Sequence, residues 1–461
     1  MKKDWEGQRV LIIGAARQGQ ALARYLAGKG ARVTLNDQLS SIDLSNVVAG
    51  LSGLGITFAL GGHPLELLDS ADLVCLSGGV PLSLPLVVEA TRRGLPLSND
   101  SQLFMEIAPC PVIGITGSAG KTTTTTLVGR IAAAGLPQSR RAWVGGNIGL
   151  PMIDHVDEMK PDDLVVLELS SFQLEQMTLS PRVAAVLNIT PNHLDRHGSM
   201  EAYTAAKAHI LLHQDRGDVA VLNHEDEGSW ALAGLVQGRL VTFSLNPPPP
   251  GQAGVYLAHG WLSLQDGDRQ VEIMPQSLIA LRGAHNLANV LAACAIAYAA
   301  GLPISAMPAG IQGFAGVAHR LEFVREWRGA AWYNDSIATA PERSMAAIRS
   351  FSEPLVLLAG GRDKNLPWDE FASLAHQRVD HLVVFGEAAE IILSALGLAH
   401  SGQRPYTITR CTGLQQAVQA AASLAKPGDV VLLSPGGTSF DEFRDFEERG
   451  ECFQKWVKEL S

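Results

Sequence analysis

The sequence predicts an α/β protein built from three domains. The chain has 461 residues, and at roughly 150 residues per domain this length corresponds to about three domains. Hydrophobic residues make up 46% of the chain and charged residues 18%, so several hydrophobic cores can form and a long disordered stretch is excluded. Short apolar runs alternate with helical patterns along the chain, which favours mainly parallel sheets.

The first domain is expected to span residues 1–110. An apolar run is followed by a glycine turn at Gly14, a helical pattern and a second apolar run, which together form one βαβ unit. Pro109 and Pro111 mark the expected end of the domain, because proline interrupts both strands and helices. We expect strands at 10–13, 32–35 and 73–76, and a helix at 21–26.

The second domain is expected at 111–315 and the third at 316–461. A new strand–turn–helix pattern begins the second domain, and the run 246–251, which contains four prolines, predicts a stiff surface loop within it. The third block again alternates strands with helices. We expect strands at 112–116, 164–167, 183–188, 355–358, 381–385 and 430–433, and helices at 121–134 and 200–212.

Composition and charge exclude several classes of protein. The net charge of −10 repels polyanions, so we expect no nucleic-acid partner. Five widely spaced cysteines fit neither a disulfide framework nor a CxxC metal site, and they favour a reducing cytoplasm. No signal peptide is recognised, and the longest apolar stretch, 290–304, is broken by Gly301 and Pro303, so we expect a core helix and no membrane insertion.

The strongest motif is Thr116-Gly-Ser-Ala-Gly-Lys-Thr122, which stands between an apolar strand and a helix. Glycines let backbone N–H groups converge on phosphate oxygens, and the helix N-terminus adds positive potential. Lys121 can contact the β- and γ-phosphates, while the Thr122 hydroxyl can bind Mg²⁺. Ile115 departs from the strict GxxxxGK[ST] pattern, but the context still predicts ATP binding.

Other polar residues follow the strands of this second domain. Glu168 ends an apolar strand, where it can either hold the metal of the phosphate loop or cap the next helix. His193 and His197 have the spacing of a zinc pair, but Pro191 and Gly198 leave room for barely one helical turn, so zinc is disfavoured.

A second glycine turn, Gly14-Ala-Ala-Arg-Gln-Gly19, resembles a dinucleotide-binding turn. Ala16 replaces the glycine at which the backbone approaches a pyrophosphate, so NAD binding is disfavoured and a differently docked nucleotide diphosphate is at least as plausible. Asp37, at the end of the next strand, can bond a ribose or cap a turn.

Ten motifs in order along almost the whole chain resemble the Mur ligase family. They are Thr116–Thr122, Gly145–Gly149, Glu168–Glu175, His193–His197, Tyr203–Lys207, Gly283–Asn289, His319–Glu322, Asn334–Ser336, Gly360–Lys364 and Leu433–Phe443. The resemblance implies a Rossmann-like N-terminal domain that binds UDP, a central P-loop ATPase-type domain and a Rossmann-like C-terminal domain that binds glutamate.

The resemblance also assigns roles to individual residues. It makes Lys121, His193 and Lys207 catalytic, and Lys207 the lysine that is carbamylated by CO₂. Two Mg²⁺ ions would be held by Thr122, Glu168, His193 and Lys207. ATP would contact Gly117, Ser118, Ala119, Gly120, Lys121, Thr122, Thr123, Asn289, Arg320 and Asp335. The UDP-sugar substrate would contact Gly14, Arg17, Gln18, Asp37, Asn147 and Ser170, and the amino acid would contact Thr339, Lys364, Ser439 and Phe446.

The implied reaction is ATP-dependent joining of D-glutamate to UDP-N-acetylmuramoyl-L-alanine through an acyl phosphate, as part of peptidoglycan-precursor synthesis by a monomer. The chain departs from the family pattern at Ala119, where Asn is common, at Asn192, where Asp is frequent, and at Ile337, where many relatives have Lys. The alternatives are a related ligase that adds L-glutamate or another amino acid, and an accessory ATPase that uses the same loop. Domain closure over the nucleotide is expected, because an acyl phosphate must be shielded from water.

Overall fold

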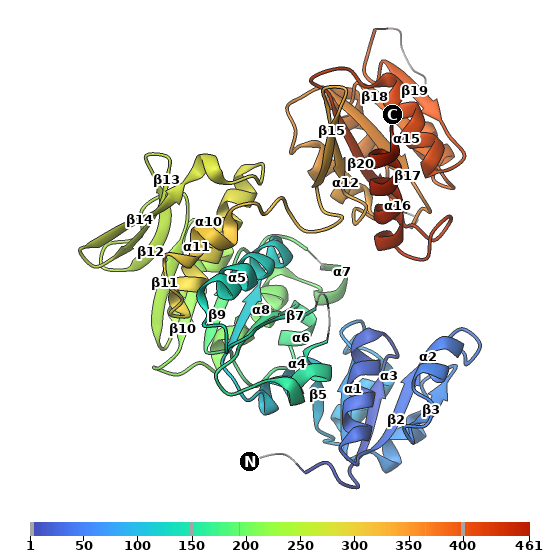
Figure 1. Ribbon diagram of the computed structural model, residues 1–461. Helices are drawn as coiled ribbons and strands as arrows, with labels where there is room; N and C mark the ends of the chain where they lie inside the picture. Colours follow the sequence, from blue (N-terminus) through green and yellow to red (C-terminus); the bar gives the residue numbers. More distant parts are fainter. Residues whose placement is uncertain (1–3, 148, 150, 193, 365, 398–401) are drawn as a thin grey trace. The chain divides into compact units, whose positions relative to one another are not determined.

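The computed structural model describes residues 4–147, 149, 151–192, 194–364, 366–397 and 402–461. Three sheets, each mostly parallel, confirm the expected three-domain α/β architecture. Contacts divide the chain into two compact units, Met1–Ala280 with Ala284–Phe314, and Leu281–Gly283 with Ala315–Ser461 (Figure 1). The domain boundaries after residues 110 and 315 stay predictions.

The first sheet has five parallel strands in the order β3-β2-β1-β4-β5. Its order reverses between β1 and β4, and at such a switch point the strand ends open a crevice for a ligand. Helix α1 begins at Arg17, earlier than expected, because Gly19 lets the helix pack closely on the preceding turn: a Cβ there would lie 1.9 Å from the Gly14 carbonyl oxygen. The elements are β1 Arg9–Ile13, α1 Arg17–Gly28, β2 Arg32–Asp37, α2 Ser45–Gly50, β3 Thr57–Leu60, η1 Leu65–Ser70, β4 Leu73–Leu76, α3 Pro85–Arg92, β5 Leu97–Asn99 and α4 Asp100–Ile107.

The second sheet has nine strands in the order β14-β13-β12-β11-β10-β9-β6-β8-β7. Strands β6 to β12 are parallel, whereas β12, β13 and β14 form an antiparallel extension that was not anticipated from the sequence. The proline-rich run lies in the connection between β11 and β12. The strands are β6 Val112–Thr116, β7 Ala142–Gly146, β8 Leu164–Glu168, β9 Val183–Val186, β10 Val219–Asn223, β11 Arg239–Phe243, β12 Ala253–Ala258, β13 Trp261–Asp266 and β14 Arg269–Pro275.

Helices cover this second sheet. Helix α5 follows the phosphate loop, and α10 packs beside it (Figure 1). The helices are α5 Lys121–Gly135, η2 Met152–Glu158, α6 Ser171–Leu174, α7 Leu194–His197, α8 Met200–Leu212, α9 Glu227–Trp230, η3 Ala233–Leu235, η4 Gln276–Leu278, α10 Ala284–Ala299 and α11 Ala306–Ile311.

Helix α10 corresponds to the long apolar stretch of the sequence. Every residue from Asn289 to Ala297 is buried, so the apolar surface of the helix is covered by the protein itself. The helix ends before Gly301, whose φ of +75° suits glycine and stops the helix. Within the described part of the chain, none of the helices combines the length and apolarity needed to cross a bilayer.

The third sheet, in the C-terminal unit, has six strands in the order β15-β16-β20-β17-β18-β19. All neighbours are parallel except β15 and β16. The elements are β15 Glu322–Trp327, β16 Ala330–Asn334, α12 Pro341–Ile348, β17 Leu355–Gly360, α13 Asp369–Arg378, β18 His381–Phe385, α14 Ala389–Leu396, β19 Thr407–Arg410, α15 Leu414–Leu424, β20 Val430–Gly436 and α16 Phe446–Glu459.

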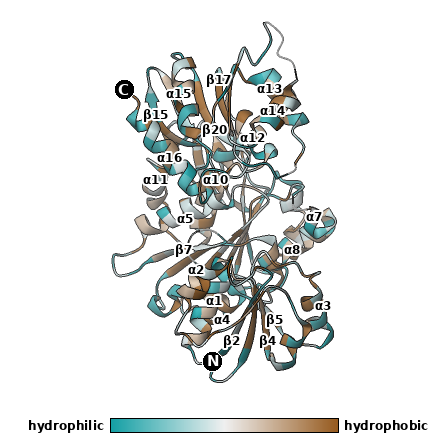
Figure 2. Cartoon of the chain, turned by 90° about the vertical axis from the view of Figure 1, so that its right-hand side faces the viewer, coloured by the Kyte–Doolittle hydropathy of each residue, from teal (hydrophilic) through white to brown (hydrophobic). Residues whose placement is uncertain are grey.

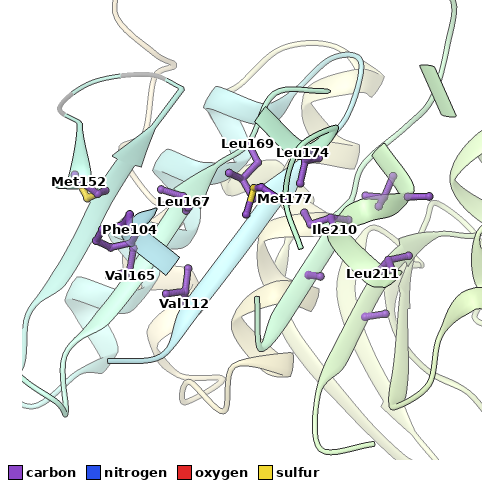
Figure 3. Packing of buried hydrophobic residues seen from close by; sticks show 14 of the residues in the cluster. Phe104, Val112, Met152, Val165, Leu167, Leu169, Leu174, Met177, Ile210 and Leu211 are labelled. Carbon is purple, nitrogen blue, oxygen red and sulfur yellow. The ribbon is translucent and has the colours of Figure 1, made fainter. Parts of the chain in front are cut away.

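The hydrophobic cores lie where helices cover sheet faces. In the central domain, one buried hydrophobic cluster extends from Val112 of β6 and Val165 of β8 through Met177 to Leu211 of α8 (Figure 3). The buried strands are correspondingly hydrophobic, while hydrophilic residues gather on exposed helix surfaces (Figure 2). Because burying an aliphatic side chain contributes about 1.5–3 kcal/mol, these cores fix the strand ends that carry the polar residues described next.

Candidate functional site

The phosphate loop connects β6 to the N-terminus of α5 and has the conformation that a phosphate cradle needs. Gly120 has a φ of +80°, which places it in the left-handed region and directs the chain into the helix. A Cβ at this position would lie 2.1 Å from Oδ1 of Asn289 on α10. The structure therefore brings Asn289 against the loop, as the predicted ATP site requires, and explains why residue 120 is glycine.

The end of strand β9 holds the loop in place. The backbone N–H of Ala119 donates to Oδ1 of Asn188 over 2.8 Å, and the Asn188 side-chain amide donates back to the Ala119 carbonyl over 3.1 Å. Ser118 donates through its hydroxyl to the Thr190 carbonyl over 2.9 Å. Asn188 was not singled out in the sequence as a site residue, although its place after a strand next to the loop was a usable signal.

Thr122 and Glu168 meet at the start of α5. The Thr122 hydroxyl donates to Oε2 of Glu168 over 3.0 Å, and the Asn147 amide donates to Oε1 over 3.2 Å. Glu168 is the last residue of β8 and is only 1% exposed. A hydroxyl and a carboxylate side by side offer the oxygen ligands that Mg²⁺ prefers.

His193, the predicted histidine ligand, lies outside the described residues. His197 has Nε2 3.0 Å from the Ser171 hydroxyl and stacks on Phe172, with ring centroids 5.1 Å apart. Among the residues that the structure does describe, no three His, Cys, Asp or Glu side chains converge on one point.

Lys207 of α8 lies beneath the phosphate loop and is only 1% exposed. Its Nζ donates to the Gly117 carbonyl over 3.0 Å and lies 4.7 Å from the centre of the Tyr203 ring. Burial and the positive charge of Lys121 lower the pKa of the Lys207 amine, Glu168 acts in the opposite direction, and together they leave the pKa at about 6. The amine is therefore largely uncharged at neutral pH, unlike a lysine on a helix surface.

Lys121 and Tyr203 complete this cluster. Lys121 Nζ donates to the Gly117 carbonyl over 2.8 Å, so its ammonium lies over the loop itself. The Tyr203 hydroxyl is 3.0 Å from the Ser118 hydroxyl, which links α8 to the loop. Thr123 is buried at the start of α5. Tyr203 was noticed in the sequence only as part of a motif, since nothing in a lone aromatic residue indicated this contact.

The N-terminal crevice contains the first group of predicted substrate residues. Oδ2 of Asp37 accepts from the Ala15 backbone N–H over 2.7 Å, so Asp37 caps the turn that follows Gly14. Gln18 accepts a bond from the Gly78 N–H over 3.3 Å, and Arg17 is exposed at the start of α1. The residues around β1, β2 and β4 are thus assembled at the switch point.

His63 is a polar residue of this crevice that the sequence did not indicate. The buried Asn36 amide donates to the Ala59 and Gly62 carbonyls, so its Oδ1 faces His63 Nδ1 as an acceptor at 2.6 Å. This arrangement makes Nδ1 the protonated nitrogen and leaves Nε2 available. A histidine beside Asn36 and Asp37 lies at the strand ends where a nucleotide would dock.

Ser170, another predicted substrate residue, is the N-cap of α6. Its hydroxyl accepts from the Gln173 N–H over 3.3 Å, and Oε1 of Gln173 accepts from the Ser170 backbone N–H over 3.0 Å, which completes a capping box. Gln173 in turn donates to the Ser101 hydroxyl over 2.7 Å, and its carbonyl accepts from Asn99 over 2.9 Å. The segment after Glu168 is therefore fixed by helix α4.

In the C-terminal unit, Asp335 follows β16 and is fully enclosed. Its carboxylate accepts from the Ser434 hydroxyl over 2.7 Å and from the Leu321 N–H over 3.2 Å. Burial raises the pKa of Asp335, these hydrogen bonds and Arg320 offset part of that rise, and the resulting pKa is about 7. Because Arg320 and Asp335 belong to the second unit, their approach to the phosphate loop stays a prediction.

The predicted amino-acid pocket is also in this unit. Lys364 donates to the Thr339 hydroxyl over 3.2 Å, so the structure pairs these two residues. Burial and the nearby Arg343 lower the pKa of Lys364. Ser439 is buried, and its carbonyl accepts from the Phe443 N–H, whereas Phe446 starts α16 with its ring edge-on to His319. Their shared role stays a prediction.

Three family models match consecutive parts of the chain. They describe a Mur ligase MurD-like N-terminal domain over residues 8–98, a Mur ligase middle domain over 115–297 and a Mur ligase glutamate ligase domain over 319–437.

Full-length relatives and solved structures agree with these matches. The chain is 42% identical to the UDP-N-acetylmuramoylalanine--D-glutamate ligase of Symbiobacterium thermophilum, covering 98% of both chains. It is 41% identical to the ligase of the same name from Pelotomaculum thermopropionicum, covering 100% of this chain and 99% of that one. Its fold is similar to UDP-N-acetylmuramate-alanine ligase MurC from Thermotoga maritima, with a TM-score of 0.58 at 19% identity, covering 98% of this chain and 99% of that one. A MurF ligase from Thermotoga maritima in complex with ADP gives a TM-score of 0.57 at 17% identity, covering 100% of both chains.

Proposed function

The chain belongs to the Mur ligase family, and we propose that it joins D-glutamate to UDP-N-acetylmuramoyl-L-alanine at the cost of one ATP. This reaction contributes to peptidoglycan-precursor synthesis. The observation that carries the proposal is the meeting of Thr122 with the buried Glu168 at 3.0 Å, at the phosphate loop and in a chain with D-glutamate ligases as full-length relatives.

The loop residues bind the triphosphate of ATP. The N-terminus of α5 and the backbone N–H groups of residues 120–122 neutralise phosphate charge, and the Lys121 ammonium, already over the loop, moves onto the β- and γ-phosphates. Asn289, which touches Gly120, contacts the nucleotide. Thr122 and Glu168 fit Mg²⁺, because both supply oxygen atoms and the carboxylate is already buried. The metal supplies charge neutralisation of the transferring phosphoryl group.

Lys207 carries a carbamate in the active enzyme. Only an uncharged amine adds CO₂, and burial together with Lys121 makes the uncharged amine accessible at neutral pH. In this step the amine nitrogen forms a bond to the carbon of CO₂ and releases one proton, so a potential cation becomes an anion. The anion lies close to Lys121 and the phosphate loop, where it helps to hold a second Mg²⁺.

The reaction then proceeds in two stages. The acceptor carboxylate attacks the γ-phosphorus of ATP, ADP leaves, and an acyl phosphate forms. The uncharged amine of D-glutamate attacks the acyl carbon, and the tetrahedral intermediate loses phosphate to give the amide. The chain's own residues mainly position the reactants and stabilise negative charge.

The N-terminal and C-terminal domains bind the two substrates. The switch-point crevice around Gly14, Gln18 and Asp37 takes the UDP group, with Arg17 free to reach a phosphate and with Asn147 and Ser170 facing the sugar. In the C-terminal unit, Thr339, Lys364, Ser439 and Phe446 hold the amino acid, with Lys364 matching its carboxylates in charge. Arg320 and Asp335 close on ATP in the working enzyme, which we take to be a monomer in the cytoplasm.

An acceptor-dependent assay tests this function. Purified protein, ATP and UDP-N-acetylmuramoyl-L-alanine are combined with D-glutamate, L-glutamate, diaminopimelate or L-lysine, and phosphate release is measured. We expect release only with acceptor and D-glutamate together. Turnover with another amino acid would assign the chain to a related ligase; the comparison matters because Ile337 stands where many relatives have lysine. Phosphate release without acceptor would refute the ligase assignment.

A further inference from the structure

A cavity of about 560 Å³ opens at the edge of the central sheet opposite the phosphate loop. It is lined by the first residues of strands β6 and β8, where Val112 and Leu164 lie, and by the last residues of helices α5 and α10 with the turns that follow them. Each five-residue strand separates this edge from the loop by roughly 17 Å. The cavity is therefore separate from the ATP site.

The lining has the chemistry of a site for an organic anion with an apolar body. Arg140 and Arg182 are the charged residues among the described lining residues, and no acidic side chain is among them, although the chain as a whole has a net charge of −10. Arg140 donates through Nε to the Asp162 carbonyl, and Arg182 directly precedes β9, so two guanidinium groups stand at this end of the sheet. Val112, Leu136 and Leu302 offer apolar surface between them.

Four of the strands and helices that line the cavity with one end also carry residues of the predicted ATP site, at the opposite end or nearer to it. Strand β6 leads from Val112 to the phosphate loop, and β8 leads from Leu164 to Glu168. Helix α5 begins with Lys121 and ends in the cavity at Gly135, and α10 carries Asn289 and ends there at Ala299 (Figure 1). A molecule that shifts these ends acts on packed, rigid elements, which transmit displacement because interiors are close-packed.

We propose that this cavity is an allosteric site for a small amphipathic organic anion, and that its occupation changes the affinity of the phosphate loop for ATP. The anionic group pairs with Arg140 and Arg182, and the apolar body lies against Val112, Leu136 and Leu302. By linkage, ATP changes the affinity of the cavity by the same factor.

Fluorescence of 1-anilinonaphthalene-8-sulfonate, an anion with an aromatic body, provides the binding test. We expect saturable binding to the full chain that weakens at least about 10-fold in the double variant Arg140→Gln/Arg182→Gln and in Ala300→Phe, which fills the cavity. The matched control is Arg216→Gln/Arg269→Gln, which removes two exposed arginines that do not line it. Equal binding to wild type and to both cavity variants, each with an unchanged melting curve, would overturn the proposal.

Calorimetric titration with a non-hydrolysable ATP analogue tests the coupling. A saturating concentration of the probe is expected to change the affinity of wild type and of the control variant for the analogue by about 5-fold or more. In the cavity variants the affinity for the analogue should not change when the probe is added. An unchanged affinity in wild type, or one-for-one displacement of the probe by the analogue, would contradict the allosteric link. Probe fluorescence does not depend on ligase turnover, so failure of the proposed function is distinguishable from failure of this inference.

Discussion

Asn289 stands so close to Gly120 that any Cβ at position 120 would lie 2.1 Å from its Oδ1. The contact joins α10 to the phosphate loop, and the loop conformation depends on it because Gly120 also has a φ of +80°. An alanine at this position must adopt a left-handed backbone conformation, which costs about 1–3 kcal/mol, and its methyl group must displace the Asn289 side chain.

Gly120→Ala is therefore expected to weaken ATP binding by about 10-fold or more, as measured by calorimetry with a non-hydrolysable analogue. Gly251→Ala is the matched control, since Gly251 has the same φ of +80° but open space around its Cβ position. Equal affinities in the two variants would show that the Asn289 contact does not matter.

Lys121→Ala is expected to reduce turnover by at least about 100-fold, because one positive charge that stabilises the transferring phosphoryl group is lost. The side chain is partly exposed, so the melting temperature should change little. Lys160→Ala, at an exposed position of the same unit, serves as the control. Near-normal phosphate release by Lys121→Ala would exclude the proposed role of the loop.

Lys207→Ala is expected to lose activity and to regain part of it when a short carboxylic acid such as acetate is added. The variant leaves space where the carbamate would lie, and an added carboxylate can supply the missing anion. Lys207→Arg, which keeps a cation and fills the space, should show no rescue. Rescue of both variants, or of neither, would speak against a carbamate.

The Asp335 carboxyl predicts a pH dependence of stability in the C-terminal unit. Its pKa is raised from 3.8 to about 7, so its stabilising contribution is complete below pH 3.8 and is lost as the pH rises through 7. Asp335→Asn should therefore gain stability relative to wild type as the pH rises from 5 to 8, by up to about 3 kcal/mol. Hydrogen exchange of β16 and β20 amides measures this difference, with the exposed Asp369→Asn as control. A difference that does not grow with pH would contradict the prediction.

The strand-and-glycine pattern was enough to predict the three-domain fold and the phosphate loop. Apolar runs such as 381–385 became strands with the expected bounds, because buried parallel strands are hydrophobic throughout. The antiparallel strands β13 and β14 were missed, since each contains several polar residues and their pairing is decided by the neighbouring strand β12.

The site was most directly predictable where one segment carries the whole signal. Residues 117–122 are contiguous, so their pattern is visible in the sequence. Asn188 and His63 act through contacts with residues distant in the chain, and the unusual pKa of Lys207 arises from burial that no local pattern shows. The order of the site residues along the chain could be seen in the sequence. Their pKa values could not, because these depend on burial and on neighbouring charges in the folded structure.

The antiparallel extension also has a practical use. The turn between β13 and β14 contains Gly267, which has a φ of +59° and open space around its Cβ position. It lies next to the exposed Asp268 in a hairpin at the margin of the nine-stranded sheet. Exposed hairpin tips accept inserted sequence well. A peptide tag or a fluorescent protein grafted after Gly267 would report on the enzyme in living cells while leaving nucleotide chemistry intact.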